Sequence, residues 1–267
     1  MFGNHLLTTI LVFLFAATLL YRISYLRRRK FWNLTLQQLL TLVIIPGVFL
    51  PIIFSYIFTL TLQPEVGMVF IHDKVLINII LLALVFGYGG VAMHAVSQIL
   101  SDQFHIYGGP KEVIEINRFF HMTFSHNLTF AAAALVLLGI TLLELNHEPN
   151  STPIGIASGI IRGLLLGGAA ALATYNYTRY TSGDVGRWND FKVSFMVVWI
   201  GFVVLLYSIQ QLNPKLTDYQ LLLPSLLSFS VLIILSLVLV IRRVGKRWQV
   251  QVKPKAMEQY LRGQDVD

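Results

Sequence analysis

The feature that most constrains this chain is a series of seven long, mostly apolar stretches separated by short polar segments. A helix needs roughly 20 mostly apolar residues to cross the hydrocarbon core of a bilayer. The seven stretches, each near that length, are Leu6–Tyr21, Leu36–Leu62, Val75–Leu100, Phe119–Leu143, Ile154–Tyr175, Val193–Ile209 and Leu221–Ile241. They predict an all-α fold, a polytopic bundle of seven transmembrane helices. The connections between them are too short to hold a separate soluble domain.

The composition excludes several other classes of protein. Charged residues make up 12% of the chain and hydrophobic residues 55%. A soluble domain has about 25% charged residues, so this chain has too few charges to cover a globular surface that faces water. That excludes a water-soluble enzyme and a disordered chain. The absence of cysteine excludes a disulfide-rich secreted module.

The basic residues predict which way the helices run. They follow the first apolar stretch rather than precede it, which favours a retained first helix with the N-terminus outside. On that topology the inner segments 22–32, 101–118, 177–192 and 242–267 carry 17 of the 20 Lys and Arg residues. This agrees with the positive-inside rule. We therefore expect a transmembrane domain over residues 1–241 and a basic cytoplasmic tail over residues 242–267.

The same charge distribution indicates the partners and the location. The net charge of +7 reflects topology and contact with anionic lipid, not nucleic-acid binding. The lipid bilayer is the expected partner, and nucleic acid is not. The short loops and the absence of cysteine favour the plasma membrane of a prokaryote.

The fifth apolar stretch carries glycines at four-residue intervals. On a helix these residues share one face, and their missing side chains let another backbone approach closely. The glycines are Gly155, Gly159, Gly163 and Gly167. This face predicts tight packing inside the chain or, alternatively, an interface with a second copy or a membrane-complex partner.

Two other stretches contain unusual residues for a transmembrane helix. Pro46, Gly47 and Pro51 lie in the second stretch, and proline removes a backbone hydrogen bond, so we expect a kink there. Arg162 is a strongly charged residue well inside the fifth stretch. A charge at that position is costly, so we expect it to pair with an acidic residue such as Glu144 or Asp73, or to hold an anionic head group.

Four of the seven histidines lie between residues 94 and 126, in the third and fourth stretches and the loop that joins them. The two stretches run in opposite directions and meet at a turn near residues 106–110, so residues equally far from this turn lie at similar depth. His94 and His126 form such a pair, about 5–10 Å below the inner interface. Ionisable groups at this depth usually face the bundle interior or a wet cavity.

The histidines have several interpretations. Axial imidazoles from two helices at one depth are what haem b needs, which makes His94 and His126 candidate haem ligands. His94, His121 and His126, with Asp102 or His105, could instead supply three or four ligands to a transition-metal ion. Against a metal site, His121 and His126 are five positions apart, which is about 140° around an α-helix. The remaining interpretations are a proton or ion path and packing through hydrogen bonds.

Two classes of function follow. The first, slightly preferred, is an integral membrane protein whose inner-leaflet histidine cluster binds haem or a metal ion for redox or lipid-directed chemistry. The second is a non-enzymatic transporter, channel or membrane-complex assembly subunit, in which the histidines pack the bundle or relay protons. The chain resembles retinal proteins and G-protein-coupled receptors in helix count alone. The last stretch has no lysine for a Schiff base, and the chain has no cysteine.

Overall fold

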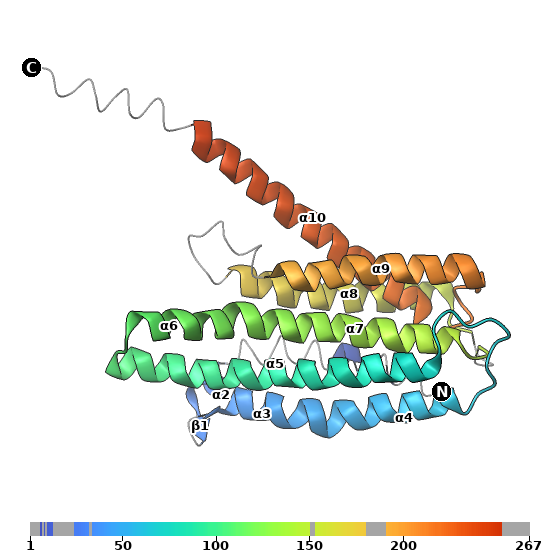
Figure 1. The fold of residues 1–267 in the computed structure, drawn as a ribbon, viewed down its shortest axis with the longest axis horizontal. Coiled ribbons are helices and arrows are strands. Elements are labelled where there is room, and N and C mark those ends of the chain that lie inside the picture. The colour runs from blue at the N-terminus through green and yellow to red at the C-terminus, as the bar shows by residue number, and fades with distance from the viewer. Residues whose placement is uncertain are drawn as a thin grey trace, which may run out of the picture.

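The part of the chain that the structure describes is helical apart from a short hairpin and the loops (Figure 1). The computed structural model describes Leu6, Thr8 and residues 10–12, 24–31, 34–149, 153–179 and 191–252. The elements are α2 Ser24–Arg28, β1 Lys30–Phe31, β2 Leu34–Thr35, α3 Leu36–Ile44, η1 Ile45–Phe49, α4 Leu50–Thr61, α5 Asp73–Tyr107, α6 Lys111–Arg118, η2 Phe119–Phe124, α7 Ser125–Leu145, α8 Ile156–Arg179, α9 Lys192–Leu212 and α10 Leu222–Val252. The η elements are π-helical turns. Strands β1 and β2 pair in antiparallel orientation.

Five helices of the described chain are long and apolar enough to cross a membrane, which confirms an all-α, multi-pass architecture. They are Asp73–Tyr107, Lys111–Leu145, Ile156–Thr174, Lys192–Leu212 and Leu222–Arg242, and they correspond to the third to seventh predicted stretches. Most of the first stretch lies outside the described residues. The total of seven spans and the inside–outside orientation stay predictions.

The second predicted stretch is helical but interrupted. The α-helical hydrogen-bond pattern of α3 gives way to the π turn η1 at Ile45–Phe49, which contains Pro46 and Gly47, and resumes in α4. A proline cannot donate the backbone hydrogen bond that an α-helix requires at that position, so a local change of winding is expected. Within this stretch, Gly47–Thr61 forms an apolar helix shorter than the five candidate spans.

The predicted tail begins as a continuation of α10. This helix runs from Leu222 to Val252 and therefore extends beyond Ile241, where the last apolar stretch ends. Its C-terminal part leaves the rest of the bundle at an angle (Figure 1). Residues 253–267 of the tail lie outside the described residues.

Helix α7 is the central helix of the bundle. Of the apolar stretch in Lys111–Leu145, 67% is buried, against 22–33% in the other four candidate spans. In Figure 1 the continuous helix formed by α6, η2 and α7 lies between α5 on one side and α8 and α9 on the other. Polar side chains on α7 are therefore surrounded by protein rather than by lipid.

Helices α5 and α7 approach closely through glycine. A Cβ atom placed on Gly90 of α5 would lie 2.6 Å from Thr129 Oγ1 and 2.9 Å from the carbonyl oxygen of Ser125 on α7. One placed on Gly139 of α7 would lie 2.6 Å from Ile80 Cγ1 of α5. Close backbone approach of this kind is how helices gain packing energy where lipid removes the hydrophobic driving force.

The glycine face of α8 is covered by α10 of the same chain. Added Cβ atoms would lie 2.8 Å from Leu223 Cδ2 at Gly159, 3.0 Å from Pro224 Cα at Gly163 and 2.9 Å from Ser228 Cα at Gly167. Packing inside the chain therefore accounts for three of the four glycines. Gly155 has no such neighbour within 4 Å. An interface with a second copy or another membrane protein stays a prediction.

One end of the bundle is held by the buried carboxylate of Glu144, and we refer to it as the Glu144 end. The backbone N–H groups of Gln220 and Leu221, just before α10, donate to Glu144 Oε1 and Oε2 at 2.7 and 2.8 Å. The hydroxyl of Tyr56 donates to Oε1 at 2.9 Å. An anion at a helix N-terminus satisfies donors that have no partner within the helix. Glu144 thereby ties α4, α7 and α10 together.

The glycine face generates a first prediction. Substituting Gly163→Ala should lower the free energy of unfolding of the detergent-solubilised protein by about 1–3 kcal/mol, because the new methyl group meets the backbone of Pro224. The matched control is Gly155→Ala, where the methyl group enters open space. Thermal melting of both variants checks this. Equal melting temperatures would show that α8 and α10 are not packed as described.

Candidate functional site

Three histidines from two neighbouring helices come together at the end of the bundle opposite Glu144. His94 lies on α5, His121 in the π turn η2 and His126 in the first turn of α7. The Nε2 atoms of His94 and His121 are 3.2 Å apart. Ring centroids are 4.5 Å apart for His94 and His121, 4.9 Å for His94 and His126, and 6.3 Å for His121 and His126. We refer to these residues as the histidine trio.

The π turn explains how His121 and His126 reach the same side of their helix. In a regular α-helix, residues five apart point in different directions. A π-helix has i→i+5 hydrogen bonds and turns less per residue than an α-helix, so the angle between residues five apart becomes smaller, and such turns are frequent at functional sites. Because η2 spans Phe119–Phe124, both rings face His94 on α5. The sequence-based objection to a metal site assumed a regular α-helix, and the π turn reduces the angle on which it was based.

A hydrogen bond and a stacking contact fix the orientation of the His126 ring. Its Nδ1 atom lies 2.8 Å from the carbonyl oxygen of Met122. A carbonyl oxygen can only accept, so Nδ1 carries the proton, and in the neutral ring Nε2 carries the lone pair. The ring of Phe191, just before α9, stacks on His126 with an interplanar angle of 22° and a centroid distance of 6.1 Å. His126 is buried, whereas His94 and His121 are partly exposed.

Asp102 and His105 lie further toward the C-terminal end of α5 than His94, although Asp102 is close enough to His121 to interact with it electrostatically. They follow His94 by eight and eleven residues on α5, which corresponds to about 12 and 16 Å along the helix axis. The Nζ atom of Lys30 donates to Asp102 Oδ2 at 2.6 Å. His105 is exposed. The structure thus brings together three of the five sequence-predicted metal ligands.

The trio is not a preformed metal site. Across the described ranges, no group of three or more His, Cys, Asp or Glu side chains is already arranged to hold a metal ion. The His94–His121 pair nevertheless has ligand-like spacing. Zinc–nitrogen bonds of 2.0–2.1 Å in a tetrahedral site place two ligand nitrogens about 3.3–3.4 Å apart. Binding would require His126 to move closer to His121.

Haem b fits the same residues less well. A haem held by His94 and His126 would place its porphyrin ring between the two imidazoles. Here the imidazoles contact one another directly, with centroids 4.9 Å apart. Close packing at Gly90 holds α5 against α7 one turn away from His94. This arrangement leaves no space for a macrocycle between the two rings.

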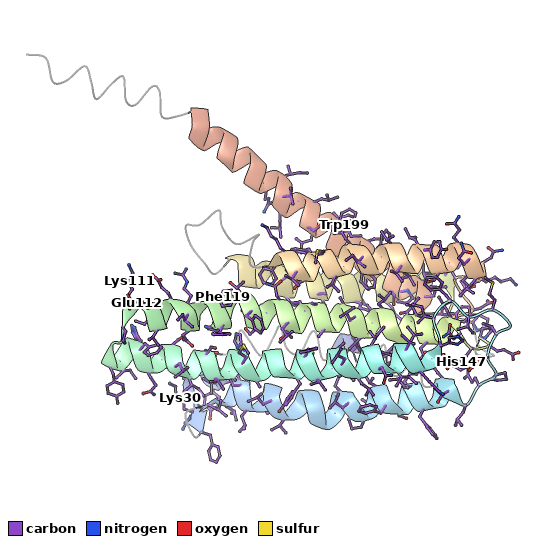
Figure 2. All side chains as sticks on the ribbon, in the orientation of Figure 1. Lys30, Lys111, Glu112, Phe119, His147 and Trp199 are labelled. Carbon is purple, nitrogen blue, oxygen red and sulfur yellow. The ribbon has the colours of Figure 1, made fainter. Side chains whose placement is uncertain are left out.

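A polar network beside the trio joins α3, α5 and α6, and we refer to this region as the Asp102 end. Gln38 Nε2 donates to Gln98 Oε1 at 2.9 Å. Asn117 Nδ2 donates to the carbonyl oxygen of Ser97 at 3.0 Å and to Ser101 Oγ at 2.9 Å. Figure 2 shows that Lys30 and Lys111 lie at this end and His147 at the other. These bonds position the segment of α5 that follows His94.

Sequence reasoning missed two contributors to this region. Gln38 is the third residue of the second apolar stretch and bonds to Gln98 near the same end of the bundle. Its position near that end was the signal from which the contact could have been predicted. Phe191 stacks on His126 from the start of α9, and no local pattern marks it. Arg162 lies away from the histidine trio, in the N-terminal part of α8, which is the part nearer the Glu144 end. Its side chain is partly buried.

Comparisons with known proteins give no family assignment. No protein-family model, no curated protein and no solved structure matches the chain. The functional argument therefore depends on the geometry of the site alone.

The close approach at Gly90 generates a second prediction. Substituting Gly90→Ala should separate α5 from α7 and lower the free energy of unfolding by about 1–3 kcal/mol, because the methyl group meets Thr129 and the backbone of Ser125. The control is its neighbour Gly89→Ala, which has no neighbouring atom within 4 Å. Thermal melting in detergent distinguishes the two. A Gly89 variant that loses as much stability would contradict the packing described for this face.

Proposed function

We propose that the chain is a multi-pass membrane protein that binds one transition-metal ion through His94, His121 and His126, for redox or lipid-directed chemistry. The membrane assignment follows from the five long apolar helices. The single observation that supports the metal site best is the 3.2 Å distance between Nε2 of His94 and Nε2 of His121. This distance matches the spacing of two nitrogen ligands on one ion.

The surroundings of His126 support its role as the third ligand. Metal-ligating histidines almost always donate their other ring N–H to a carbonyl, a carboxylate or water, which fixes the ring and its tautomer. The contact from His126 Nδ1 to the Met122 carbonyl is of this kind. The ring of Phe191 stacks on the His126 ring. A small shift of the ring toward His121 would then complete a three-histidine site.

The donor set restricts the metal. Imidazole nitrogen suits zinc, copper, nickel and iron, whereas calcium and magnesium take oxygen ligands. The chain has no cysteine to add a thiolate. We therefore expect a first-row transition metal with three nitrogen ligands and an open fourth position, the arrangement found in catalytic zinc sites.

The location of the trio follows from the topology proposed for the chain. If the N-terminus is outside, the Asp102 end faces the cytoplasm and the trio lies near the inner leaflet. The basic residues Lys30 and Lys111 at this end support that orientation through the positive-inside rule. We propose the plasma membrane of a prokaryote as the location.

The third prediction tests the metal site. The purified full-length protein should bind about one Co²⁺ or Zn²⁺ ion per chain. Substituting His94→Ala or His121→Ala should weaken binding at least about 100-fold, since even loss of an outer-shell partner costs 10–100-fold. Isothermal titration calorimetry in detergent measures the affinity. His105→Ala is the control and should bind as the unmodified protein does, because His105 lies outside the trio. Equal affinities in all variants would contradict the proposal.

A second candidate function is favoured by the same contact. The 3.2 Å distance between two Nε2 atoms is also that of a hydrogen bond between two imidazoles, and histidine is suited to pass protons near neutral pH. On this alternative the chain is a transporter, a channel or an assembly subunit without a metal ion.

The fourth prediction separates this alternative from the metal site. If the pair relays protons, metal-free protein in liposomes should conduct protons, and His94→Ala should abolish the flux, as reported by an internal pH-sensitive dye. His105→Ala is again the control. Proton flux that is identical in both variants would exclude the relay.

A further inference from the structure

Helix α2 and the strands β1 and β2 form a small unit at the Asp102 end, which we refer to as the basic hairpin. We infer that the basic hairpin is a docking site for the head group of an anionic phospholipid, with Arg28 and Arg29 binding the phosphate. The inference goes beyond the proposed function, because it depends neither on a metal ion nor on the histidine trio.

The first argument is charge. Arg28, Arg29 and Lys30 follow one another, and the chain has no Asp or Glu before Glu65. Lys30 is paired with α5, because its Nζ atom lies 2.6 Å from Asp102 Oδ2. Arg28 and Arg29 are exposed, and neither forms an ion pair with any Asp or Glu in the described part of the chain. Two guanidinium groups therefore remain to bind an anion from outside the chain.

The second argument is the orientation of Arg29. Its Cζ atom lies 5.3 Å from the centroid of the Tyr25 ring, a distance typical of a cation–π contact. A guanidinium group carries its N–H donors in its own plane, in a fork that matches two oxygen atoms of one phosphate. Stacking uses the face of the group and leaves these in-plane donors for a ligand.

The third argument is the fixed backbone beneath these side chains. The N–H of Arg29 donates to the carbonyl oxygen of Tyr25 at 3.1 Å, and its own carbonyl oxygen accepts from the N–H of Leu36 at 2.8 Å. Strands β1 and β2 pair with each other, and the bond from Lys30 to Asp102 ties the hairpin to α5. A site whose backbone is already ordered loses less conformational entropy when a ligand binds.

The fourth argument is location. The basic hairpin lies within residues 22–35, the short connection between the first two predicted apolar stretches, and α3 begins directly after β2. Figure 1 shows β1 at the edge of the bundle. The side chains of Tyr25 and Phe31 are 59% and 55% exposed, and aromatic rings are common at the membrane–water boundary. On the topology proposed above, this end faces the inner leaflet, whose anionic lipids attract basic segments close to a transmembrane helix.

Helix α6 provides a contrast at the same end of the bundle. It carries two exposed basic residues, Lys111 and Arg118, and two exposed acidic residues, Glu112 and Glu115. Residues three or four apart on a helix are neighbours, so Glu115 is next to both basic residues. The charges of α6 therefore cancel within the helix, whereas those of Arg28 and Arg29 do not. This difference makes α6 a control for the effect of net charge alone.

The fifth prediction tests the basic hairpin with a fluorescent phosphatidylglycerol. The full-length protein in an uncharged detergent should bind this lipid, as measured by fluorescence anisotropy. Substituting Arg28→Gln together with Arg29→Gln should weaken binding about 30-fold, since each basic residue near anionic lipid contributes about fivefold. The double variant Lys111→Gln with Arg118→Gln removes the same charge from the same end and should bind as the unmodified protein does.

A charge-conserving variant guards against an effect on folding. Arg28→Lys together with Arg29→Lys keeps both charges but loses the planar fork, so its affinity should lie between those of the unmodified protein and the glutamine variant. A lysine variant that binds no better than the glutamine variant would overturn the inference. Equal losses in the hairpin and α6 glutamine variants would also overturn it, because net charge alone would then explain the attraction.

Competing ligands identify the source of the phosphate. Unlabelled phosphatidylglycerol should displace the probe, and diacylglycerol with the same acyl chains should not, because it lacks the phosphate. Phosphatidylcholine should compete more weakly, since its choline cation cancels the negative charge. Inorganic phosphate that competes as well as phosphatidylglycerol, at equal concentration, would overturn the assignment to a lipid. Equal competition by diacylglycerol would show that the acyl chains alone are bound and would overturn the inference.

Discussion

The close packing of α5 on α7 is the contact on which the rest of the structure depends. Gly90 lets the two helices approach, and a Cβ atom there would lie 2.6 Å from Thr129 Oγ1. The same helix pair is joined at its other end, where Asp73 accepts hydrogen bonds at 2.8 Å from Asn146 Nδ2 and His147 Nε2. With both ends of the pair fixed, the depth of His94 relative to the rings opposite is determined.

Polar groups have different roles at the two ends of the bundle. At the Glu144 end, the carboxylate accepts two backbone N–H groups and the Tyr56 hydroxyl, so its polar atoms are used in holding helices together. At the Asp102 end, His94 and His121 contact each other and remain partly exposed. Satisfied polar groups stabilise a fold, whereas neighbouring imidazole nitrogens near a surface are suited to a ligand or to a proton. For this reason the proposed site is placed at the histidines and not at Glu144.

The sequence predicts the helices better than it predicts the site. Equal distance from the inner turn predicted that His94 and His126 meet, and their ring centroids lie 4.9 Å apart. The objection from the 140° angle between His121 and His126 assumed an α-helix, and helical periodicity cannot show that Phe119–Phe124 is a π turn. The glycine spacing indicated a close contact for α8 but not its partner, α10. Contacts between distant segments, such as Phe191 on His126, leave no local pattern.

The central claim is that a π turn brings His121 and His126 onto one side of their helix, against His94, where one ion can be bound. An experimental structure of the zinc-loaded protein, with an anomalous difference map recorded at the zinc absorption edge, tests this most directly. We expect one peak within bonding distance of Nε2 of His94 and of His121, with His126 as the third ligand. A regular α-helix through residues 119–124, with His121 and His126 on different faces and no peak between α5 and α7, would contradict it.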